Sequence, residues 1–180
     1  MTPAEALQLA IPTLETARLR LRAFRSEDLE LMARLNADPQ MVRYKHPPLD
    51  RIDSWRSLAM HLGHWALRGY GMWAAELEAE ARMVGWLGLY HPEGWPELEL
   101  AWTIDSAFWG RGLAPEGAAA VLDFAQSTIG RRNLISVIFP DNAASIRVAE
   151  KLGGHLERRT KIRDTDVLIY RYPAKPRDVI

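Results

Sequence analysis

The chain has 180 residues, with 23 Lys plus Arg against 23 Asp plus Glu, 48% hydrophobic residues and no cysteine. This length suits one domain with a sizeable core. The charge balance argues against a nucleic-acid partner, which needs a basic surface. The lack of cysteine excludes disulfides, thiolate metal sites and cysteine nucleophiles. No apolar run approaches the roughly 20 residues that span a bilayer, and no signal peptide is recognisable. We therefore expect a cytoplasmic protein without a membrane partner.

In chain order, the sequence predicts an arm, a strand, two helices and then a group of strands. Residues 18–22 alternate polar and apolar side chains, the period of a half-buried strand. Ser26 is a suitable helix start and Asp38-Pro39 a suitable stop. The ranges so far are 1–13 (arm), 18–22 (strand), 26–38 (helix) and a second helix from a cap at Asp50 or Asp53 to about Arg68, and 42–48 is expected to be irregular. The following strands are 72–77, 83–90 and 98–104.

The second half alternates helices and strands. Apolar residues of one helical face recur from Ala118 to Ile129, and Gly130 is a typical helix stop. The predicted ranges are 115–129 (helix), 134–139 (strand), 142–152 (helix), 155–162 (strand) and 167–172 (strand). This order predicts an α+β fold with one mixed sheet in a single domain over residues 14–172, followed by a tail, 173–180.

The loop between residues 104 and 115 carries the main chemical signal. Gly110 and Gly112 allow a close backbone approach, so that the N–H groups from Arg111 to Ala114 can converge on an anion. The helix dipole and the Arg111 cation act in the same direction. The loop therefore suits a diphosphate. The sequence lacks the Walker and dinucleotide glycine patterns, and the alternative is a turn that only joins strand to helix.

Three segments together resemble the GNAT acetyltransferase signature. They are 99–104, 108–116 and 142–153, and the opening stretch 14–22 is similar to that of the ribosomal-protein N-terminal (RimJ/RimL-like) acetyltransferase branch. The resemblance covers residues 14–172 in the family's order. It implies a mostly antiparallel mixed sheet of about seven strands flanked by about four helices, with a splay between the fourth strand, 98–104, and the fifth, 134–139.

The resemblance also implies a co-substrate, acetyl-CoA, and no metal. The residues expected to contact acetyl-CoA are Trp102, Thr103, Ile104, Trp109, Gly110, Arg111, Gly112, Leu113, Ala114, Asn142 and Ser145. Among them, Asn142 would bind the pantetheine arm, and Ser145 could reach the thioester sulfur. Trp109 is expected to pack beneath the loop.

Two positions depart from the family's pattern. Ala149 stands where many relatives carry a tyrosine that protonates the leaving thiolate, and Gly154 stands where an aromatic residue is usual. The general acid is therefore Ser145, a water molecule or no group at all. We expect the second departure to affect packing only.

The implied reaction is direct attack of a neutral primary amine on the acetyl carbonyl. Glu99 is the candidate general base, with Glu97 next, acting through water. The alternative for Glu99 is a solvent-facing strand residue or a partner for a nearby arginine. A backbone N–H near Trp102 or Thr103 would meet the oxyanion.

The histidines and tryptophans give weaker signals. His61 and His64 share a helix but lack a third metal ligand, and His46 and His91 are loop residues that could tune amine binding. We expect Trp65, Trp86 and Trp102 in the core, and Trp55, Trp73 and Trp95 near the acceptor pocket.

The sequence thus predicts an N-acetyltransferase acting most naturally on a protein or peptide N-terminal α-amine. Two alternatives stay open at this point: acetylation of a small-molecule amine such as an aminoglycoside, and a non-catalytic acyl-CoA-binding regulatory module. The partners expected are acetyl-CoA and the amine, with the chain as a monomer or homodimer.

Overall fold

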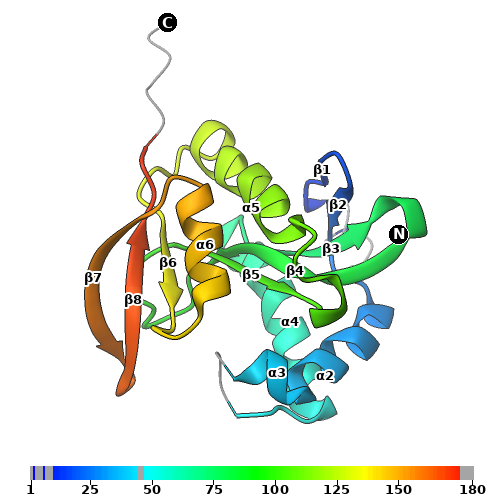
Figure 1. Cartoon of the computed structure of the whole chain (residues 1–180). Helices are drawn as coiled ribbons and strands as arrows, with labels where there is room; N and C mark the ends of the chain where they lie inside the picture. The colour runs from blue at the N-terminus through cyan, green and yellow to red at the C-terminus, as the bar shows by residue number, and fades with distance from the viewer. Residues whose placement is uncertain (1, 3–5, 7–9, 44–46, 175–180) are drawn as a thin grey trace, which may run out of the picture.

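The computed structural model describes residues 2, 6, 10–43 and 47–174 (Figure 1). His46 and residues 175–180 of the predicted tail lie outside this part. The strands form one sheet in the order β1-β2-β3-β4-β5-β6-β8-β7, antiparallel except between β5 and β6. Their bounds are β1 Leu14–Glu15, β2 Leu19–Arg22, β3 Met72–Leu77, β4 Arg82–Tyr90, β5 Glu99–Ile104, β6 Ile135–Ile138, β7 His155–Ile162 and β8 Thr165–Arg171.

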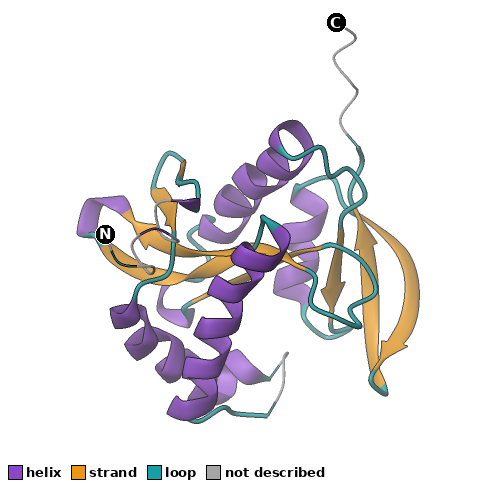
Figure 2. Ribbon diagram, turned by 180° about the vertical axis from the view of Figure 1, so that it is seen from behind, coloured by secondary structure: helices purple, strands orange, loops and turns teal. Residues whose placement is uncertain are grey.

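Helices cover both faces of the sheet. Figure 1 shows α5 and α6 in front of the strands, and Figure 2, from behind, shows the long helix α4 on the other face. The bounds are α2 Leu29–Ala37, α3 Pro39–Val42, α4 Arg51–Arg68, α5 Leu113–Asp123 and α6 Ala143–Lys151. This arrangement confirms the predicted α+β fold with a mixed sheet.

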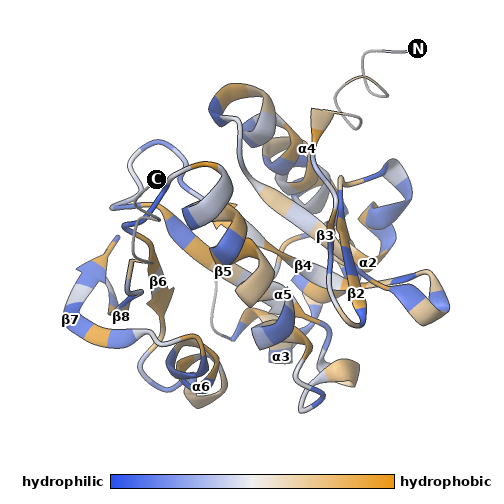
Figure 3. Ribbon diagram, turned by 90° about the horizontal axis from the view of Figure 1, so that it is seen from above, coloured by the Kyte–Doolittle hydropathy of each residue, from blue (hydrophilic) through white to orange (hydrophobic). Residues whose placement is uncertain are grey.

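The core is divided by the sheet into two layers. On β3, Trp73 and Ala75 belong to the cluster beneath α5, whereas Met72 and Ala74 belong to the cluster beneath α2 and α4. This follows from the alternation of side chains across a strand. Toward the end of the sheet the strands become more polar. Figure 3 shows that β6 is mostly hydrophobic, whereas the outermost strand β7 is largely hydrophilic.

The counts differ slightly from the prediction. The described residues hold eight strands instead of about seven, because the two-residue strand β1 pairs with β2. The extra helix is α3, which begins at Pro39 within the predicted stop, where the Asp38 side chain accepts from the Gln40 N–H at 2.8 Å. α5 starts at Leu113, two residues before the predicted start, and continues as a π-helical turn, Phe124–Thr128.

Two further findings concern the described residues only. None of their helices is both long and apolar enough to cross a bilayer. They also contain no group of three or more His, Cys, Asp or Glu side chains arranged to hold a metal ion.

Candidate active site

The candidate site lies where β5 and β6 separate. The register joins these two parallel strands at a single pair, Glu99↔Ile135, and the Ile135 N–H donates to the Leu98 carbonyl at 3.0 Å. No further pair joins the two strands toward Ile104 within the described residues, so the expected splay between them is present. We call the point of separation the apex.

Side chains replace the backbone ladder at the apex. In a continuous parallel ladder, the N–H of Val137 would donate to the carbonyl of Leu100. Instead, Val137 donates to Glu99 Oε1 at 3.2 Å, and the Ser136 hydroxyl donates to the Leu100 carbonyl at 2.5 Å. Both of these side chains are buried. The splay therefore starts from a fixed, hydrogen-bonded point.

Glu99 is the titratable group at this point. Its side chain is 7% exposed, and its second oxygen, Oε2, accepts from Trp95 Nε1 at 2.8 Å. Burial raises the pKa of Glu99 to about 8, although the hydrogen bonds from Val137 and Trp95 act in the opposite direction. Glu99 is thus neither solvent-facing nor paired with an arginine, which excludes the alternative offered by the sequence. A carboxylate oxygen can accept more than one hydrogen bond, so both oxygens keep capacity for a further donor.

The backbone of β5 presents one free edge to the splay. The Asp105 N–H donates to a carbonyl of β4 at 2.8 Å. Because alternate residues of an antiparallel strand face opposite sides, Thr103 also faces β4, while Trp102 and Ile104 face the splay. The Ile104 carbonyl accepts from Trp109 Nε1 at 2.6 Å. The polar backbone groups of Trp102 therefore point into the gap.

The glycine loop leads directly into α5. Gly110 and Gly112 both have φ +76°, a left-handed conformation in which glycine is strongly favoured. Gly112 is the N-cap of α5, so the N–H groups that follow have no intrahelical acceptor. The Arg111 guanidinium lies 4.9 Å from the centroid of the Phe108 ring. Successive backbone N–H groups in such a turn can converge on an anion.

Asn142 and Ser145 lie together at the start of α6. Asn142 is the N-cap of this helix, and its Oδ1 accepts from the Ser145 N–H at 3.1 Å. This bond fixes the Asn142 side chain and leaves its amide N–H groups and the Ser145 hydroxyl for other partners. Asn142 thus has a capping role that the sequence prediction did not include.

Tyr172, which directly follows β8, lies close to Gly154 after the end of α6. A Cβ added to Gly154 would lie 2.9 Å from the Ala149 carbonyl oxygen and 3.0 Å from the Tyr172 ring. The Tyr172 hydroxyl bonds to Ser136 Oγ at 2.8 Å, and burial raises its pKa above the usual range. Gly154 therefore makes room for Tyr172, which connects to the apex through Ser136.

Several predicted residues have different roles from those expected. Trp73, expected near the acceptor, is fully buried in the core, and its indole donates to the Pro12 carbonyl at 2.7 Å. Trp102, expected in the core, is only partly buried. The second base candidate, Glu97, accepts two hydrogen bonds from Arg171, which hold its pKa below the usual range. Trp55 is 58% exposed on α4, and its part in acceptor binding stays a prediction.

The histidine pair on α4 is structural. His64 Nδ1 lies 2.8 Å from the Tyr70 carbonyl, and the His91 N–H donates to His64 Nε2 at 3.1 Å. His64 must therefore donate from Nδ1 and accept at Nε2, as a neutral ring does. It connects α4 to the loop after β4. His61 stacks on Phe24 with centroids 5.5 Å apart.

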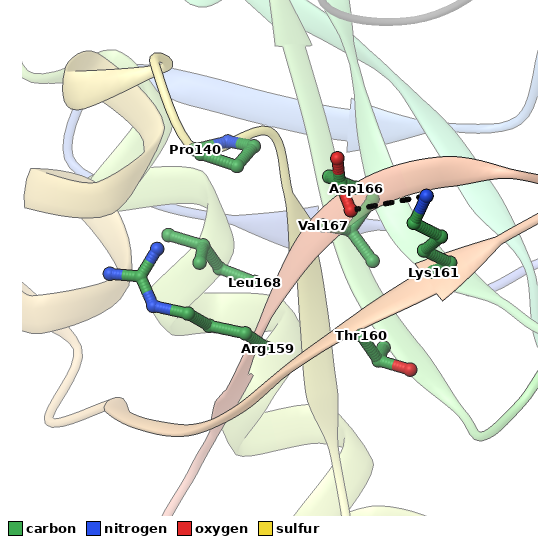
Figure 4. A pocket seen from close by; sticks show the side chains of 7 residues that line it. All are labelled: Pro140, Arg159, Thr160, Lys161, Asp166, Val167 and Leu168. Atoms are coloured by element: carbon green, nitrogen blue, oxygen red, sulfur yellow. Dashed lines mark ion pairs between the residues drawn. The ribbon is translucent and has the colours of Figure 1, made fainter.

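A separate cavity of about 380 Å³ lies on the β7–β8 hairpin (Figure 4). Its lining residues are Pro140, Arg159, Thr160, Lys161, Asp166, Val167 and Leu168. None of the predicted acetyl-CoA contacts is among them, so this cavity lies apart from the glycine loop and the splay.

Three residues near the site had no predicted role in the sequence. Ser136 and Tyr172 close the apex, and Arg18 contacts the glycine loop: its Nη1 donates to the Arg111 carbonyl at 2.8 Å. The only available signal was for Arg18, which lies in the stretch 14–22 that resembles the family. Ser136 and Tyr172 read as ordinary strand residues.

The fold is similar to those of solved acetyltransferase structures. An acetyltransferase from Agrobacterium tumefaciens str. C58 has a structure with TM-score 0.83 and 33% identity, covering 90% of this chain and 94% of that one. RimL, a ribosomal-protein alpha-N-acetyltransferase solved in complex with coenzyme A, has TM-score 0.76 over 91% of this chain and 98% of that one. At 18% identity it shows likeness of fold alone.

A relative of described activity is the FsC-acetyl coenzyme A-N(2)-transacetylase of Aspergillus fumigatus. It is 29% identical over 161 residues, which cover 80% of this chain and 65% of that protein. The family model described as the acetyltransferase (GNAT) domain matches residues 18–155. The chain therefore belongs to the GNAT acetyltransferase family, whose members use acetyl-CoA as co-substrate, and it is an N-acetyltransferase.

Proposed function

We propose that the protein transfers an acetyl group to the N-terminal α-amine of a protein or peptide. The observation that carries this proposal is the buried carboxyl group of Glu99 at the apex, with a pKa of about 8. An α-amine has a pKa of about 8, whereas a lysine amine has one of about 10.4. A base whose pKa lies near the working pH can remove the proton of the substrate, and an α-amine, with its lower pKa, gives up that proton more readily than a lysine amine does.

The glycine loop and the free edge of β5 support acetyl-CoA as the donor. The glycine loop around Gly110 and Gly112 suits the diphosphate, and the outward carbonyl of Trp102 suits an amide N–H of the pantetheine arm. Asn142 would add a side-chain donor from α6. Bound there, acetyl-CoA supplies an activated acetyl group and a thiolate that leaves readily.

Within this proposal, the residues at the apex act on protons and on charge. Ionised Glu99 takes a proton from the substrate ammonium through a water molecule, so that a neutral amine attacks the acetyl carbonyl. The Trp102 N–H, which faces the splay, stabilises the oxyanion. Ser145 protonates the departing thiolate or leaves this step to water. Thr103 is unsuited to the oxyanion role because its backbone faces β4.

A small-molecule amine is the second candidate acceptor. It is favoured by the similarity to the Aspergillus fumigatus protein, whose name describes transfer to an N(2) position. An aminoglycoside-like substrate belongs to the same candidate class. The two acceptor classes use the same donor site and differ only in what occupies the acceptor side of the apex.

Mass spectrometry of matched peptides tests the proposal. Each peptide carries a free α-amine and one lysine, and its control is the same peptide with a formylated N-terminus. We expect one acetyl group on the α-amine of the free peptide, with equimolar release of CoA, and no acetylation of the control. Equal acetylation of both peptides would place the activity on side-chain amines. Turnover with small amines alone would favour the second candidate.

A further inference from the structure

Arg18 is bound to α5 through both its backbone and its side chain. Its backbone N–H donates to Glu116 Oε1 at 2.8 Å, and its Nε donates to Glu116 Oε2 at 2.7 Å. The Thr16 hydroxyl donates to the same carboxylate at 2.7 Å. The turn before β2 is thereby attached to the first turns of α5, about 100 residues later in the chain.

A further bond reaches the glycine loop itself. Arg18 Nη1 donates to the carbonyl of Arg111 at 2.8 Å, and a Cβ built on Gly112 would lie 3.5 Å from Arg18 Nη2. In a trans peptide, the C=O of one residue and the N–H of the next point in opposite directions. Because Arg18 holds the Arg111 carbonyl, the N–H of Gly112 is directed to the opposite side of the loop.

The contribution of this arrangement is geometric. The carboxylate of Glu116 neutralises the guanidinium of Arg18, with N–O distances down to 2.6 Å, and the Arg18 side chain is 47% exposed. An exposed, neutralised pair adds little long-range attraction for a phosphate. The Arg18–Glu116 pair does determine the orientation of the Arg111–Gly112 peptide plane. Without this contact, the two glycines of the loop would have several conformations open to them.

We propose that Arg18 is a positioning residue for the diphosphate of acetyl-CoA. Held by Glu116, it fixes the Arg111–Gly112 peptide so that the Gly112 N–H faces the anion. Arg18 and Glu116 thus preorganise the loop before the ligand binds, which lowers the entropy that binding must remove. This inference rests on the proposed use of residues 110–114 as the diphosphate site.

Binding measurements with two donors test the inference. The variants are Arg18→Met, which keeps an apolar stem, and Arg18→Lys, which keeps the charge without the planar fork. Arg20→Met is the matched control, because Arg20 is also 47% exposed but pairs with Glu15. The ligands are acetyl-CoA and S-acetylpantetheine, which lacks the diphosphate. Titration calorimetry gives Kd for acetyl-CoA, and the steady-state KM is compared for both donors.

We expect both Arg18 variants to bind acetyl-CoA about tenfold more weakly, the effect of one charge-assisted hydrogen bond. KM for S-acetylpantetheine should stay unchanged, and Arg20→Met should match the parent for both donors. Parent-like acetyl-CoA affinity in Arg18→Met, full affinity in Arg18→Lys, or an equal loss for both donors would each overturn the inference. Failure of the parent to bind acetyl-CoA would overturn the proposed function, and this inference with it.

Discussion

The buried carboxyl group of Glu99 makes the stability of the protein depend on pH. Burial raises the pKa of Glu99 from 4.5 to about 8 in the folded protein. Between these two values the folded state holds a proton that the unfolded state has already lost. The free energy of unfolding therefore falls as the pH rises through this interval. Replacing Glu99 with glutamine removes the titrating group and keeps the shape of the side chain.

The size of the change in the free energy of unfolding follows from the difference between the two pKa values of Glu99. Each pH unit between 4.5 and about 8 lowers the free energy of unfolding by about 1.4 kcal/mol. The whole interval amounts to about 5 kcal/mol, a large part of the 5–15 kcal/mol typical of a folded domain. The side chain is 7% exposed, so screening by solvent is small. Glu99→Gln also leaves Trp95 or Val137 facing an amide N–H, a penalty that is constant with pH.

Urea unfolding of the parent and Glu99→Gln across this pH range measures the effect. The readout is the difference between the two free energies at each pH, because the titration of all other groups cancels. We expect the parent to be the more stable protein at pH 4.5 and to lose about 5 kcal/mol relative to the variant by pH 9. Two curves that run parallel over the range would refute a raised pKa for Glu99.

Other substitutions test the remaining parts of the site and fold. Ser136→Ala leaves the Leu100 carbonyl and the Tyr172 hydroxyl without their partner at the apex. We expect thermal unfolding to show a free energy of unfolding lower by about 1–3 kcal/mol, together with a lower kcat. Parent-like values for both quantities would contradict the structural role of the apex. Arg22→Met leaves the buried carboxylates of Asp28 and Glu76 without a cation. Denaturant unfolding should show a free energy of unfolding lower by about 3–5 kcal/mol. A decrease below about 1 kcal/mol would argue against a buried ionic network.

The sequence was most informative where local chemistry decides the structure. The long helix α4 was predicted from a cap at Asp50 or Asp53 and a break at Gly69. In the structure Asp50 is the cap, and Gly69 ends the helix in a left-handed conformation. The glycine loop was predicted because Gly110 and Gly112 allow a close backbone approach, and both adopt a left-handed conformation in the structure. In such places the decisive interactions lie within a few residues, and composition reveals them.

The missed features depend on contacts between distant segments. Strand β1 has two residues, too few for alternation to indicate a strand, and it exists because β2 pairs with it. The hydrogen bonds that Thr16 and Arg18 donate to the Glu116 carboxylate join segments about 100 residues apart in the chain. From the local sequence, Glu116 in the first turn of α5 is explained equally well by a favourable interaction with the helix dipole.

Burial of polar groups was equally hard to predict. Glu99 in a strand indicates a surface carboxylate as readily as a buried one, and only the position of β6 decides between them. Trp73 was expected near the acceptor because of its neighbours in sequence, but the packing of α4 and α5 around the sheet encloses it. Tyr172 reaches Ser136 through the pairing of β6 with β8, which no motif encodes.

The central claim is that residues 110–114 and the splay hold acetyl-CoA, and titration calorimetry on two tryptophan variants tests it most directly. Gly112→Trp places a bulky side chain at the loop, and Gly130→Trp is its control, because Gly130 also has a positive φ, +67°, and open space around it. We expect parent-like binding of acetyl-CoA in the control and about 100-fold weaker binding in Gly112→Trp, the loss of two hydrogen bonds to a charged group. Equal affinity in both folded variants would contradict the proposed site.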